Sequence, residues 1–257
     1  MKILVAGTGF IGSKLVERLE QEHRVKTLDR NTGDYQQDIT KDFKIEEEFD
    51  VVFHTIGLAP GMNSEEAYRQ VHVKGTENLL NAVKSDKIIY ISALKAGEIP
   101  HSFFQTKKQA EKLVKNDGRD YTILRPSTVY GEGNKLMEMI RTAAPLRVFP
   151  NIKTETQPIH IDDLTEILAK STEEFDGETL EAAGPEKMNV AEMARKIYAE
   201  EGFKCLLLPA PRFLQETGLK ILPFSGPFSR ENIYLLRQQN TVENNDAARI
   251  LESLTEI

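Results

Sequence analysis

The first twelve residues constrain the fold most, because they predict a buried strand that runs into a glycine-rich turn and then into a helix. Residues 3–5 form an unbroken apolar run, which is typical of a parallel strand covered on both faces. Gly7, Gly9 and Gly12 follow with the spacing G-x-G-x-x-G. In a dinucleotide site the first glycine makes the tight turn, the second admits a pyrophosphate, and the third lets the helix pack on the strand.

The surroundings of this turn favour a dinucleotide site over an ordinary glycine turn. The turn lies between a strand and a helix, and Asp29 ends the next predicted strand, residues 23–29. An acidic residue at about this distance binds the ribose hydroxyls in such sites. A P-loop would need lysine directly after its last glycine, whereas here Gly12 is followed by Ser13 and then Lys14. We therefore reject the P-loop.

Strand and helix patterns alternate through the first half of the chain. Further strands are predicted at residues 35–39, 50–57, 88–92 and 121–125, and helices at 10–19, 65–84 and 102–115. Six strands interspersed with three helices predict an α/β fold of the Rossmann type, with a doubly wound parallel sheet and ligands at the carboxyl ends of the strands.

Beyond Gly131 the alternation gives way to shorter units. Helices are predicted at residues 135–142, 161–171, 190–200, 212–219 and 230–237, with strands near 179–182 and 204–208. Residues 1–131 are therefore expected to form a dinucleotide-binding domain. Residues 132–257 are expected to form a smaller α+β lobe for a substrate or partner, with some segments returning to the sheet and the last 25 or so residues docking back as helices.

Composition excludes several kinds of partner and site. A net charge of −7 argues against nucleic acid, whose binding depends on cationic contacts to phosphate. Cys205 is the lone cysteine and the five histidines show no metal-ligand spacing, so we expect neither a disulfide nor a metal. A strand at residue 2 and the lack of long apolar stretches predict no targeting segment, no transmembrane segment and a cytoplasmic protein. Small molecules or another protein remain as partners.

Several stretches together resemble the short-chain dehydrogenase/reductase superfamily, in its extended or atypical branch of epimerases and dehydratases. They are residues 6–12, 50–54, 71–80, 91–94, 107–111, 124–131, 159–163 and 183–185. The most specific are Ala-Gly-Thr-Gly-Phe-Ile-Gly at 6–12 and Arg-Pro-Ser-Thr-Val-Tyr-Gly at 125–131. Within the branch, Ile-Ser-Ala-Leu-Lys-Ala at 91–96 is most similar to atypical members related to the nucleotide-binding accessory subunit of respiratory complex I.

The resemblance implies that a nicotinamide dinucleotide is the cofactor. The glycine-rich turn would bind the pyrophosphate, Asp29 the adenosine ribose, and Lys107 the nicotinamide ribose. The full set of cofactor residues comprises Gly7, Gly9, Phe10, Ile11, Gly12, Asp29, Arg30, Asp38, Ile39, Ile56, Gly57, Lys107, Pro126, Thr128 and Val129. In this set Asp38 and Ile39 would flank the adenine, and residues 126–129 would face the nicotinamide.

Some of these positions also have a plain structural explanation. Asp38 can be a solvated turn aspartate, and Lys107 a solvated helix lysine. We expect His54 to be a packed residue at a strand end. The aspartates at 162 and 163 can cap the helix that starts there.

Two adjacent residues bear on the choice between NAD and NADP. Asp29 favours NAD, because a carboxylate accepts from two ribose hydroxyls and repels a 2′-phosphate. Arg30 opposes this preference, because its guanidinium can bind that phosphate or stack on adenine.

The residue that transfers the proton in this superfamily is missing. The family pattern has a tyrosine four residues before a lysine, and here Phe103 precedes Lys107. A shift of one position gives Phe104 and Lys108, so the hydroxyl is missing in either alignment. A phenyl ring cannot exchange a proton, and the standard acid–base mechanism is therefore absent.

The supporting positions differ as well. Ala93 stands where serine or threonine is usual, with Ser92 expected on the opposite face of the strand, and His72 replaces asparagine. Two hypotheses remain. The chain is either a dinucleotide-binding, sensing or assembly module, or an NAD(P)-dependent oxidoreductase or epimerase-like enzyme with a relocated proton donor. For the second, Lys107 and Tyr130 are the candidate catalytic residues, with Lys95 and His160 behind them.

Overall fold

The computed structural model describes residues 1–61, 63–209, 234–235 and 237–257. A seven-stranded sheet with the order β11-β6-β5-β4-β1-β2-β3 forms its centre, and every neighbouring pair is parallel. The strands are β1 (Lys2–Ala6), β2 (Arg24–Asp29), β3 (Tyr35–Gln36), β4 (Glu48–His54), β5 (Lys84–Ile91), β6 (Asp120–Pro126) and β11 (Glu178–Ala182). The predicted Rossmann-type fold is confirmed.

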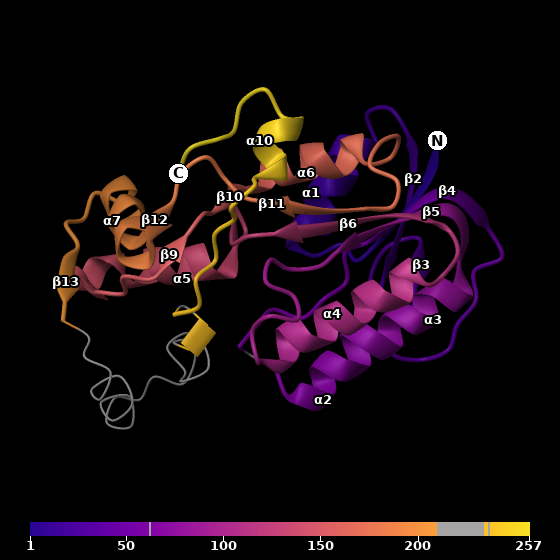
Figure 1. The fold of residues 1–257 in the computed structure, drawn as a ribbon, viewed down its shortest axis with the longest axis horizontal. Helices are drawn as coiled ribbons and strands as arrows, with labels where there is room; N and C mark the ends of the chain where they lie inside the picture. The colour runs from indigo at the N-terminus through magenta and orange to yellow at the C-terminus, as the bar shows by residue number, and fades with distance from the viewer. Residues whose placement is uncertain (62, 210–233, 236) are drawn as a thin grey trace.

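Helices cover both faces of this sheet (Figure 1). One face carries α1 (Phe10–Leu19), α6 (Ile161–Lys170) and α10 (Asp246–Ile250), and the other carries α2 (Glu65–Tyr68), α3 (Gly75–Ala82) and α4 (Ser102–Lys115). Alternate residues of β1 supply the two cores: Ile3 and Val5 join the first, Leu4 and Ala6 the second. This two-sided burial explains why the strand reads as an unbroken apolar run.

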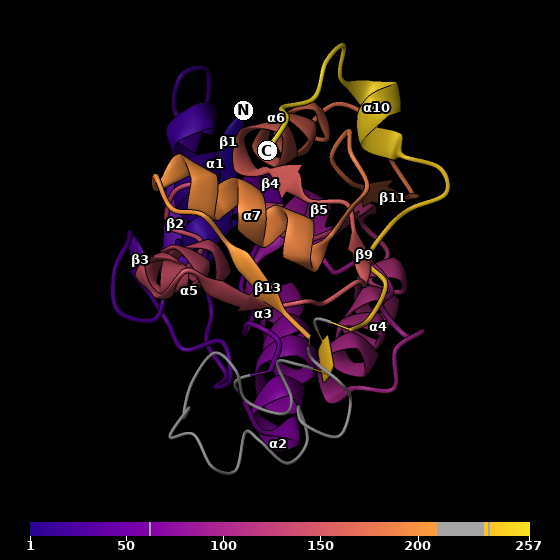
Figure 2. The same cartoon turned by 90° about the vertical axis from the view of Figure 1, so that its left-hand side faces the viewer.

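The smaller lobe lies at the left of Figure 1 and faces the viewer in Figure 2. It contains α5 (Lys135–Ala143), η2 (Ala144–Leu146), α7 (Val190–Glu200) and the short strands β7 (Val129–Tyr130), β8 (Val148–Pro150), β9 (Glu155–Thr156), β10 (Ile159–His160), β12 (Met188–Asn189) and β13 (Leu206–Leu208). As predicted, residues 132–257 also return segments to the sheet layers, namely β11, α6 and α10. The predicted helix at 212–219 lies outside the described residues, as does most of the one at 230–237. A domain boundary at residue 131 stays a prediction.

The predicted helix at residues 65–84 is wrong in detail. A wide π turn, η1 (Arg69–Lys74), separates α2 from α3, and β5 already begins at Lys84. At the start of α3 an added Cβ on Gly75 would come 2.5 Å from Ile39 Cδ1, so this glycine permits a close approach. The first residues of β5 are polar and partly exposed, which is why periodicity placed its start at Ile88.

Two predicted strands are also wrong at their ends. β3 stops at Gln36, because Asp38 instead accepts hydrogen bonds from the backbone and hydroxyl of Thr40 in a turn. β4 runs from Glu48 to His54 and leaves the sheet before Thr55. The helices predicted at residues 10–19, 102–115 and 190–200 are confirmed at both ends.

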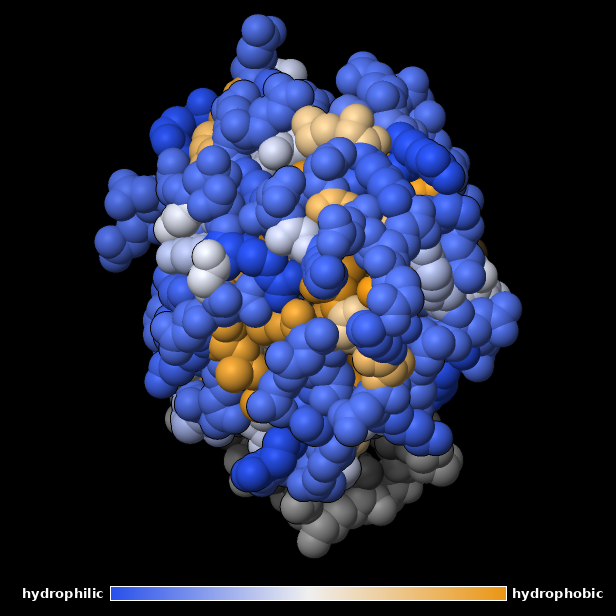
Figure 3. All heavy atoms as spheres, turned by 90° about the vertical axis from the view of Figure 1, so that its right-hand side faces the viewer, coloured by the Kyte–Doolittle hydropathy of each residue, from blue (hydrophilic) through white to orange (hydrophobic). Residues whose placement is uncertain are grey.

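The end of the molecule remote from the smaller lobe is mostly hydrophilic, with hydrophobic side chains gathered near the middle of this face (Figure 3). Among the residues described, no helix combines the length and the apolar character needed to cross a bilayer.

Candidate functional site

The glycine-rich turn lies where β1 and β4 run side by side while their following helices cover opposite faces of the sheet. Such a switch point opens a crevice beyond the carboxyl ends of the strands. Thr55 joins the two strand ends by donating from Oγ1 to the carbonyl of Gly7 at 2.6 Å. Gly7 has φ +104°, and a Cβ there would lie 2.8 Å from the backbone nitrogen of Ile56. Only glycine suits this position.

Gly9 and Gly12 occupy contrasting surroundings in the same turn. A Cβ on Gly12 would lie 1.7 Å from the carbonyl oxygen of Gly7, so this glycine permits the packing of α1 on the turn. A Cβ on Gly9 would meet nothing within 4 Å. Gly9 is the N-cap of α1, and no side chain caps the helix there. Open space before uncapped N–H groups fits a pyrophosphate, and Phe10, Ile11 and Gly12 carry those groups.

Asp29 ends β2 beside this turn, and its carboxylate accepts hydrogen bonds from Thr8 and Asn31. Its Oδ2 accepts from the backbone N–H and the hydroxyl of Thr8, both at 3.2 Å, and its Oδ1 accepts from Asn31 N at 3.4 Å. Partial burial favours the neutral acid, but these donors outweigh it and leave the pKa of Asp29 below its usual value. The carboxylate is therefore charged at neutral pH and fixed in place, with the exposed Arg30 next to it.

Asp38 and Ile39, the two residues predicted to flank adenine, lie in different surroundings. Asp38 forms the turn with Thr40, whose hydroxyl and N–H donors hold the pKa of this carboxyl below its usual value. Ile39 is 4% exposed and packs in the second core against Gly75. The contact of both residues with adenine stays a prediction.

Lys107 is a buried residue of α4 and not a solvated helix lysine. Its Nζ donates to the carbonyl of Ile91 at 2.7 Å and lies 4.9 Å from the centre of the Tyr90 ring. A Cβ on Gly57 would be 3.1 Å from this nitrogen, which places the amine beside the loop that follows β4. Burial lowers the pKa of Lys107 to about 7, although the Glu111 carboxylate opposes the shift.

Phe103, which stands where the sequence comparison predicts the superfamily's tyrosine, lies in an aromatic cluster. Its ring centre is 5.8 Å from that of Tyr68 and 5.5 Å from that of His72. His72 Nε2 accepts from Leu58 N at 3.0 Å, and its Nδ1 lies 2.9 Å from the hydroxyl of Thr106. Burial, reinforced by Lys107, lowers the pKa of His72 to about 2, so its ring is neutral.

Ser92 and His54 are both held in hydrogen bonds that do not involve Lys107. Ser92 Oγ donates to Glu111 Oε1 at 2.7 Å, and Arg125 binds both oxygens of the same carboxylate, also at 2.7 Å. His54 is 1% exposed and bonds to Thr76 through Nε2 at 2.8 Å, which confirms a packed histidine at a strand end.

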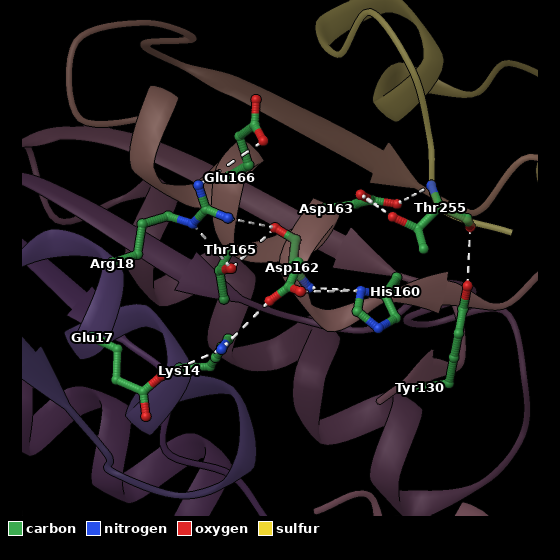
Figure 4. Close-up of polar contacts among 10 residues, drawn as sticks. All are labelled: Lys14, Glu17, Arg18, Tyr130, His160, Asp162, Asp163, Thr165, Glu166 and Thr255. Atoms are coloured by element: carbon green, nitrogen blue, oxygen red, sulfur yellow. Dashed lines mark hydrogen bonds and ion pairs between the residues drawn. The ribbon is translucent and has the colours of Figure 1, made fainter. Parts of the chain in front are cut away.

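Tyr130 and His160 belong to a polar network that ties the two lobes together (Figure 4). The Tyr130 hydroxyl donates to the carbonyl of Thr255 at 2.9 Å, and Thr255 donates to Asp163 from its N–H at 2.8 Å and its hydroxyl at 2.9 Å. Burial and the Asp163 charge raise the pKa of Tyr130. The predicted aspartate cap of α6 is wrong: His160 is the N-cap, and its Nδ1 accepts from Asp162 N at 3.3 Å.

A cavity of about 520 Å³ adjoins this network in the smaller lobe. Its lining includes Tyr130, Glu132, Arg141, His160, Glu200 and Thr255. Neither Lys107 nor Thr128 lines it. Lys95, the other candidate donor, forms an ion pair with Glu98 at 3.4 Å. The structure therefore does not bring the four candidate proton donors into one cavity.

In the segment after β6, Thr128 forms a hydrogen bond with a residue that no sequence motif indicated. Pro126 O accepts from Leu94 N at 2.9 Å, and Val129 pairs with Ile159 in the β7–β10 ribbon. Between them, Thr128 Oγ1 accepts from Asn240 Nδ2 at 2.9 Å. Asn240 lies 112 residues along the chain, and neither spacing nor periodicity could have found this contact. In the part of the chain that is described, no group of three or more His, Cys, Asp or Glu residues is placed to hold a metal ion.

With this geometry established, a family model for the NAD dependent epimerase/dehydratase family matches residues 3–191. The chain belongs to this family. The match spans the glycine-rich turn, the Phe103–Lys107 helix and the segment with Thr128.

Among curated proteins, the chain is 27% identical over 160 residues to the mitochondrial NADH-ubiquinone oxidoreductase 40 kDa subunit of Neurospora crassa, covering 59% of this chain and 42% of that protein. It is 26% identical over 165 residues to the N-acetyl-alpha-D-glucosaminyl-diphospho-ditrans,octacis-undecaprenol 4-epimerase of Escherichia coli O157:H7, covering 52% and 50%. The chain thus spans about half the length of these relatives.

Two solved structures share the fold. The UDP-glucuronic acid 4-epimerase of Bacillus cereus in complex with NAD has a TM-score of 0.69 at 22% identity, covering 82% of this chain and 87% of that one. The dTDP-4-dehydrorhamnose reductase of Bacillus anthracis in complex with NADP has a TM-score of 0.70 at 19% identity, covering 84% and 85%.

Proposed function

We propose that this chain binds NAD at its glycine-rich turn and acts as a cofactor-dependent sensing or assembly module, without the proton-transfer chemistry usual in its superfamily. The observation that carries the proposal is the contrast between two sites that adjoin the loop after β4. Gly9 leaves open space before uncapped N–H groups, while Phe103 closes the position of the proton donor with an apolar ring.

Asp29 is the basis for proposing NAD over NADP. Its oxygens lie beside Thr8 at the edge of the turn, and the lowered pKa keeps the charge that repels a 2′-phosphate. The related folds include a complex with NAD and one with NADP, so the choice rests on this chain's own residues. The exposed Arg30 is the competing influence, because a guanidinium binds phosphate well.

The assembly role has support from the Neurospora crassa relative, which is by name a subunit of a larger oxidoreductase. In such a role the bound dinucleotide stabilises the folded chain by mass action and presents a fixed surface to a protein partner. The second half of the chain, with its cavity of about 520 Å³, is the candidate region for a small-molecule substrate or that partner.

One observation favours the alternative, an oxidoreductase or epimerase-like enzyme. Lys107 is buried with its pKa lowered to about 7, and a group that titrates near neutral pH can serve as a general acid or base. Tyr130 is the weaker candidate, since its hydroxyl is bonded to the Thr255 carbonyl and its pKa is raised.

The test begins with the ultraviolet spectrum of the purified protein after denaturation, which reveals any dinucleotide that co-purifies. Calorimetric titration with NAD and then NADP in one buffer follows. We expect NAD to bind more tightly and Asp29→Asn to reduce the difference, while Arg30→Gln increases it. Tighter NADP binding by the parent would show that Arg30 prevails, and binding of neither dinucleotide would overturn the proposal.

A further inference from the structure

The ribbon formed by β8 and β13 carries most of the large hydrophobic side chains that are exposed in the described part of the chain. Apart from Met1 and Tyr234, these side chains are Leu146, Val148, Leu206 and Leu208. Leu206 is 63% exposed and Leu208 is 45% exposed. β13 lies at the outer margin of the smaller lobe in Figure 1 and faces the viewer in Figure 2. Clustered apolar side chains at a surface mark a place where another molecule binds.

The two strands of this ribbon divide their side chains between the core and the solvent. Leu206 pairs with Val148 and Leu207 with Phe149 in a parallel register. Phe149 is buried in the core of the lobe and Leu207 packs against that core. Leu206 and Val148 point to the other face, because successive side chains of a strand alternate. The outer face of the ribbon is therefore apolar and open to solvent.

The outer edge of β13 has an unused pair of backbone groups. Leu206 N donates to the carbonyl of Arg147 at 2.8 Å, and Leu208 O accepts from Asn151 N at 2.9 Å. Both leucines thus direct their backbone groups toward β8. Successive residues of a strand bond to opposite sides, so the N–H and C=O of Leu207 point away from β8. Within the described residues neither group has a hydrogen-bond partner.

The two edges of the ribbon differ in what occupies them. On the β8 edge, the carbonyl of Val148 accepts from the hydroxyl of Tyr198 at 3.0 Å. The β13 edge ends at Pro209, because proline has no N–H with which to extend a ladder. A short strand edge with a free donor, a free acceptor and exposed apolar side chains is a template for one further strand.

Cationic side chains surround this ribbon. Residues 142–154 and 202–209 contain Arg147, Lys153 and Lys204 but no aspartate or glutamate, although the chain has a net charge of −7. All three cations are exposed, and among the described residues none of them forms an ion pair. The charge of this surface is complementary to an acidic partner. A second copy of this chain would instead bring like charges together.

We propose that the outer edge of β13 binds an extended segment of another protein, which adds a third strand to the ribbon. The segment exchanges hydrogen bonds with the N–H and C=O of Leu207, covers Leu206 and Leu208 with alternate apolar side chains, and carries acidic residues at its ends. A lipid surface fits less well, because acyl chains offer neither donor nor acceptor to the backbone pair. The inference assigns a surface to the assembly role proposed above, and it rests on that role.

The test uses the full chain and two fluorescein-labelled peptides, Asp-Asp-Val-Thr-Val-Thr-Val-Asp-Asp and its counterpart with lysine in place of aspartate. We expect fluorescence anisotropy to show binding of the acidic peptide that is about tenfold tighter at low salt, with a smaller difference at high salt. The amide of Leu207 should exchange its hydrogen rapidly in the free chain and should be protected when the acidic peptide is added.

Substitutions then assign the binding to its groups. Leu207→Pro removes the outward N–H without removing a bond to β8, and should weaken binding of the acidic peptide by about threefold to tenfold. Leu207→Ala is the matched control, because it also shortens the side chain but keeps the N–H, and it should bind as the parent does. Leu206→Ser should weaken both peptides, whereas Lys204→Gln should weaken only the acidic one.

Several outcomes would overturn the strand site. These are equal binding of the two peptides, binding of neither, and a Leu207→Pro protein that binds the acidic peptide as tightly as Leu207→Ala. Slow exchange of the Leu207 amide in the free chain would also overturn it, because the edge would already be paired. A dimer that Leu207→Pro dissociates would make a second copy the occupant. Binding of phosphatidylglycerol vesicles in place of the acidic peptide would make the occupant a lipid surface.

The peptide experiment and the dinucleotide titration give separate answers. The ribbon contains none of the predicted cofactor residues, so NAD binding by the same protein tests the proposed function independently. A parent that binds NAD but neither peptide overturns only the strand site. Since the two peptides are compared on the parent, poor folding of a substituted chain cannot mask the result.

Discussion

The glycine-rich turn and the Lys107 region both adjoin the loop that follows β4, but they are built in opposite ways. At the turn, function needs only backbone N–H groups and open space, and both are present at Gly9. Around Lys107, the proton transfer usual in the superfamily needs a side-chain hydroxyl, and at the position predicted for it the Phe103 ring packs against Tyr68 and His72. Binding and chemistry therefore depend on separate groups, and a chain can lose the second while it keeps the first.

The largest effect should come from restoring the lost hydroxyl. We expect the parent to give no appreciable turnover of secondary alcohols or ketones, because positioned acid–base groups contribute about a hundredfold to ten-thousandfold. Phe103→Tyr with Ala93→Ser returns the proton donor and its partner, and should raise turnover if the crevice is otherwise intact. Absorbance at 340 nm, followed with carbonyl compounds and nucleotide sugars, measures it.

Phe104→Tyr with Ala93→Ser is the matched control, since it adds the same groups with the tyrosine one position away. Efficient turnover by the parent would contradict the contrast between the two regions, and Lys107 would then be the first residue to replace. Activity in the control as well as in the test variant would show that the hydroxyl does not need the position of Phe103.

The next effect distinguishes Gly9 from Gly12 within the turn. Gly9→Leu should weaken NAD binding by about a hundredfold, close to 3 kcal/mol, because its side chain enters the pyrophosphate path. Its thermal midpoint should stay near that of the parent, since a Cβ at Gly9 meets nothing within 4 Å. Calorimetry and thermal unfolding measure the two quantities.

Gly12→Ala is the comparison within the same turn. Its Cβ would come 1.7 Å from the carbonyl oxygen of Gly7, so we expect a loss of about 1–3 kcal/mol of stability from overpacking. Unchanged NAD affinity in Gly9→Leu would contradict the assignment of the turn to the pyrophosphate.

The smallest effect concerns the pH dependence caused by Lys107. Folding lowers its pKa from 10.5 to about 7, so between these pH values the unfolded chain binds a proton that the folded chain does not. Stability therefore rises with pH in this window, and the contribution is lost as pH falls through about 7. In urea unfolding, we expect the parent to gain on the order of 2 kcal/mol from this residue between pH 7 and pH 9.

Lys107→Met should remove that gain. Lys112→Met, which removes an exposed lysine of the same helix, should retain it. If the free energy of unfolding depends on pH equally in the parent and in Lys107→Met, Lys107 stays charged when the chain folds. Lys107 would then no longer be a candidate acid or base.

The sequence alone determined the alternating fold and the turn, because both depend on local patterns. The apolar run at residues 3–5 and the spacing of three glycines each reflect contacts that recur in every parallel sheet with a phosphate-binding helix. The prediction that Phe103 stands in place of the superfamily's tyrosine also rests on local spacing, since Phe103 precedes Lys107 by four residues. Both ends of the helix at residues 102–115 were predicted correctly, because they too depend on a local pattern.

What surrounds these residues depends on contacts between segments that are distant in the sequence. The burial of Lys107 depends on the carbonyl of Ile91 and the ring of Tyr90, which come from another strand. The hydroxyl of Tyr130 is hydrogen-bonded to the carbonyl of Thr255, which lies 125 residues away. The hydroxyl of Thr128 is hydrogen-bonded to Asn240, which lies 112 residues away. Such contacts carry no local signal, because they arise where distant segments meet after the sheet has formed. The sequence thus names the chemical groups, and the packing of distant segments determines which of them are free to act.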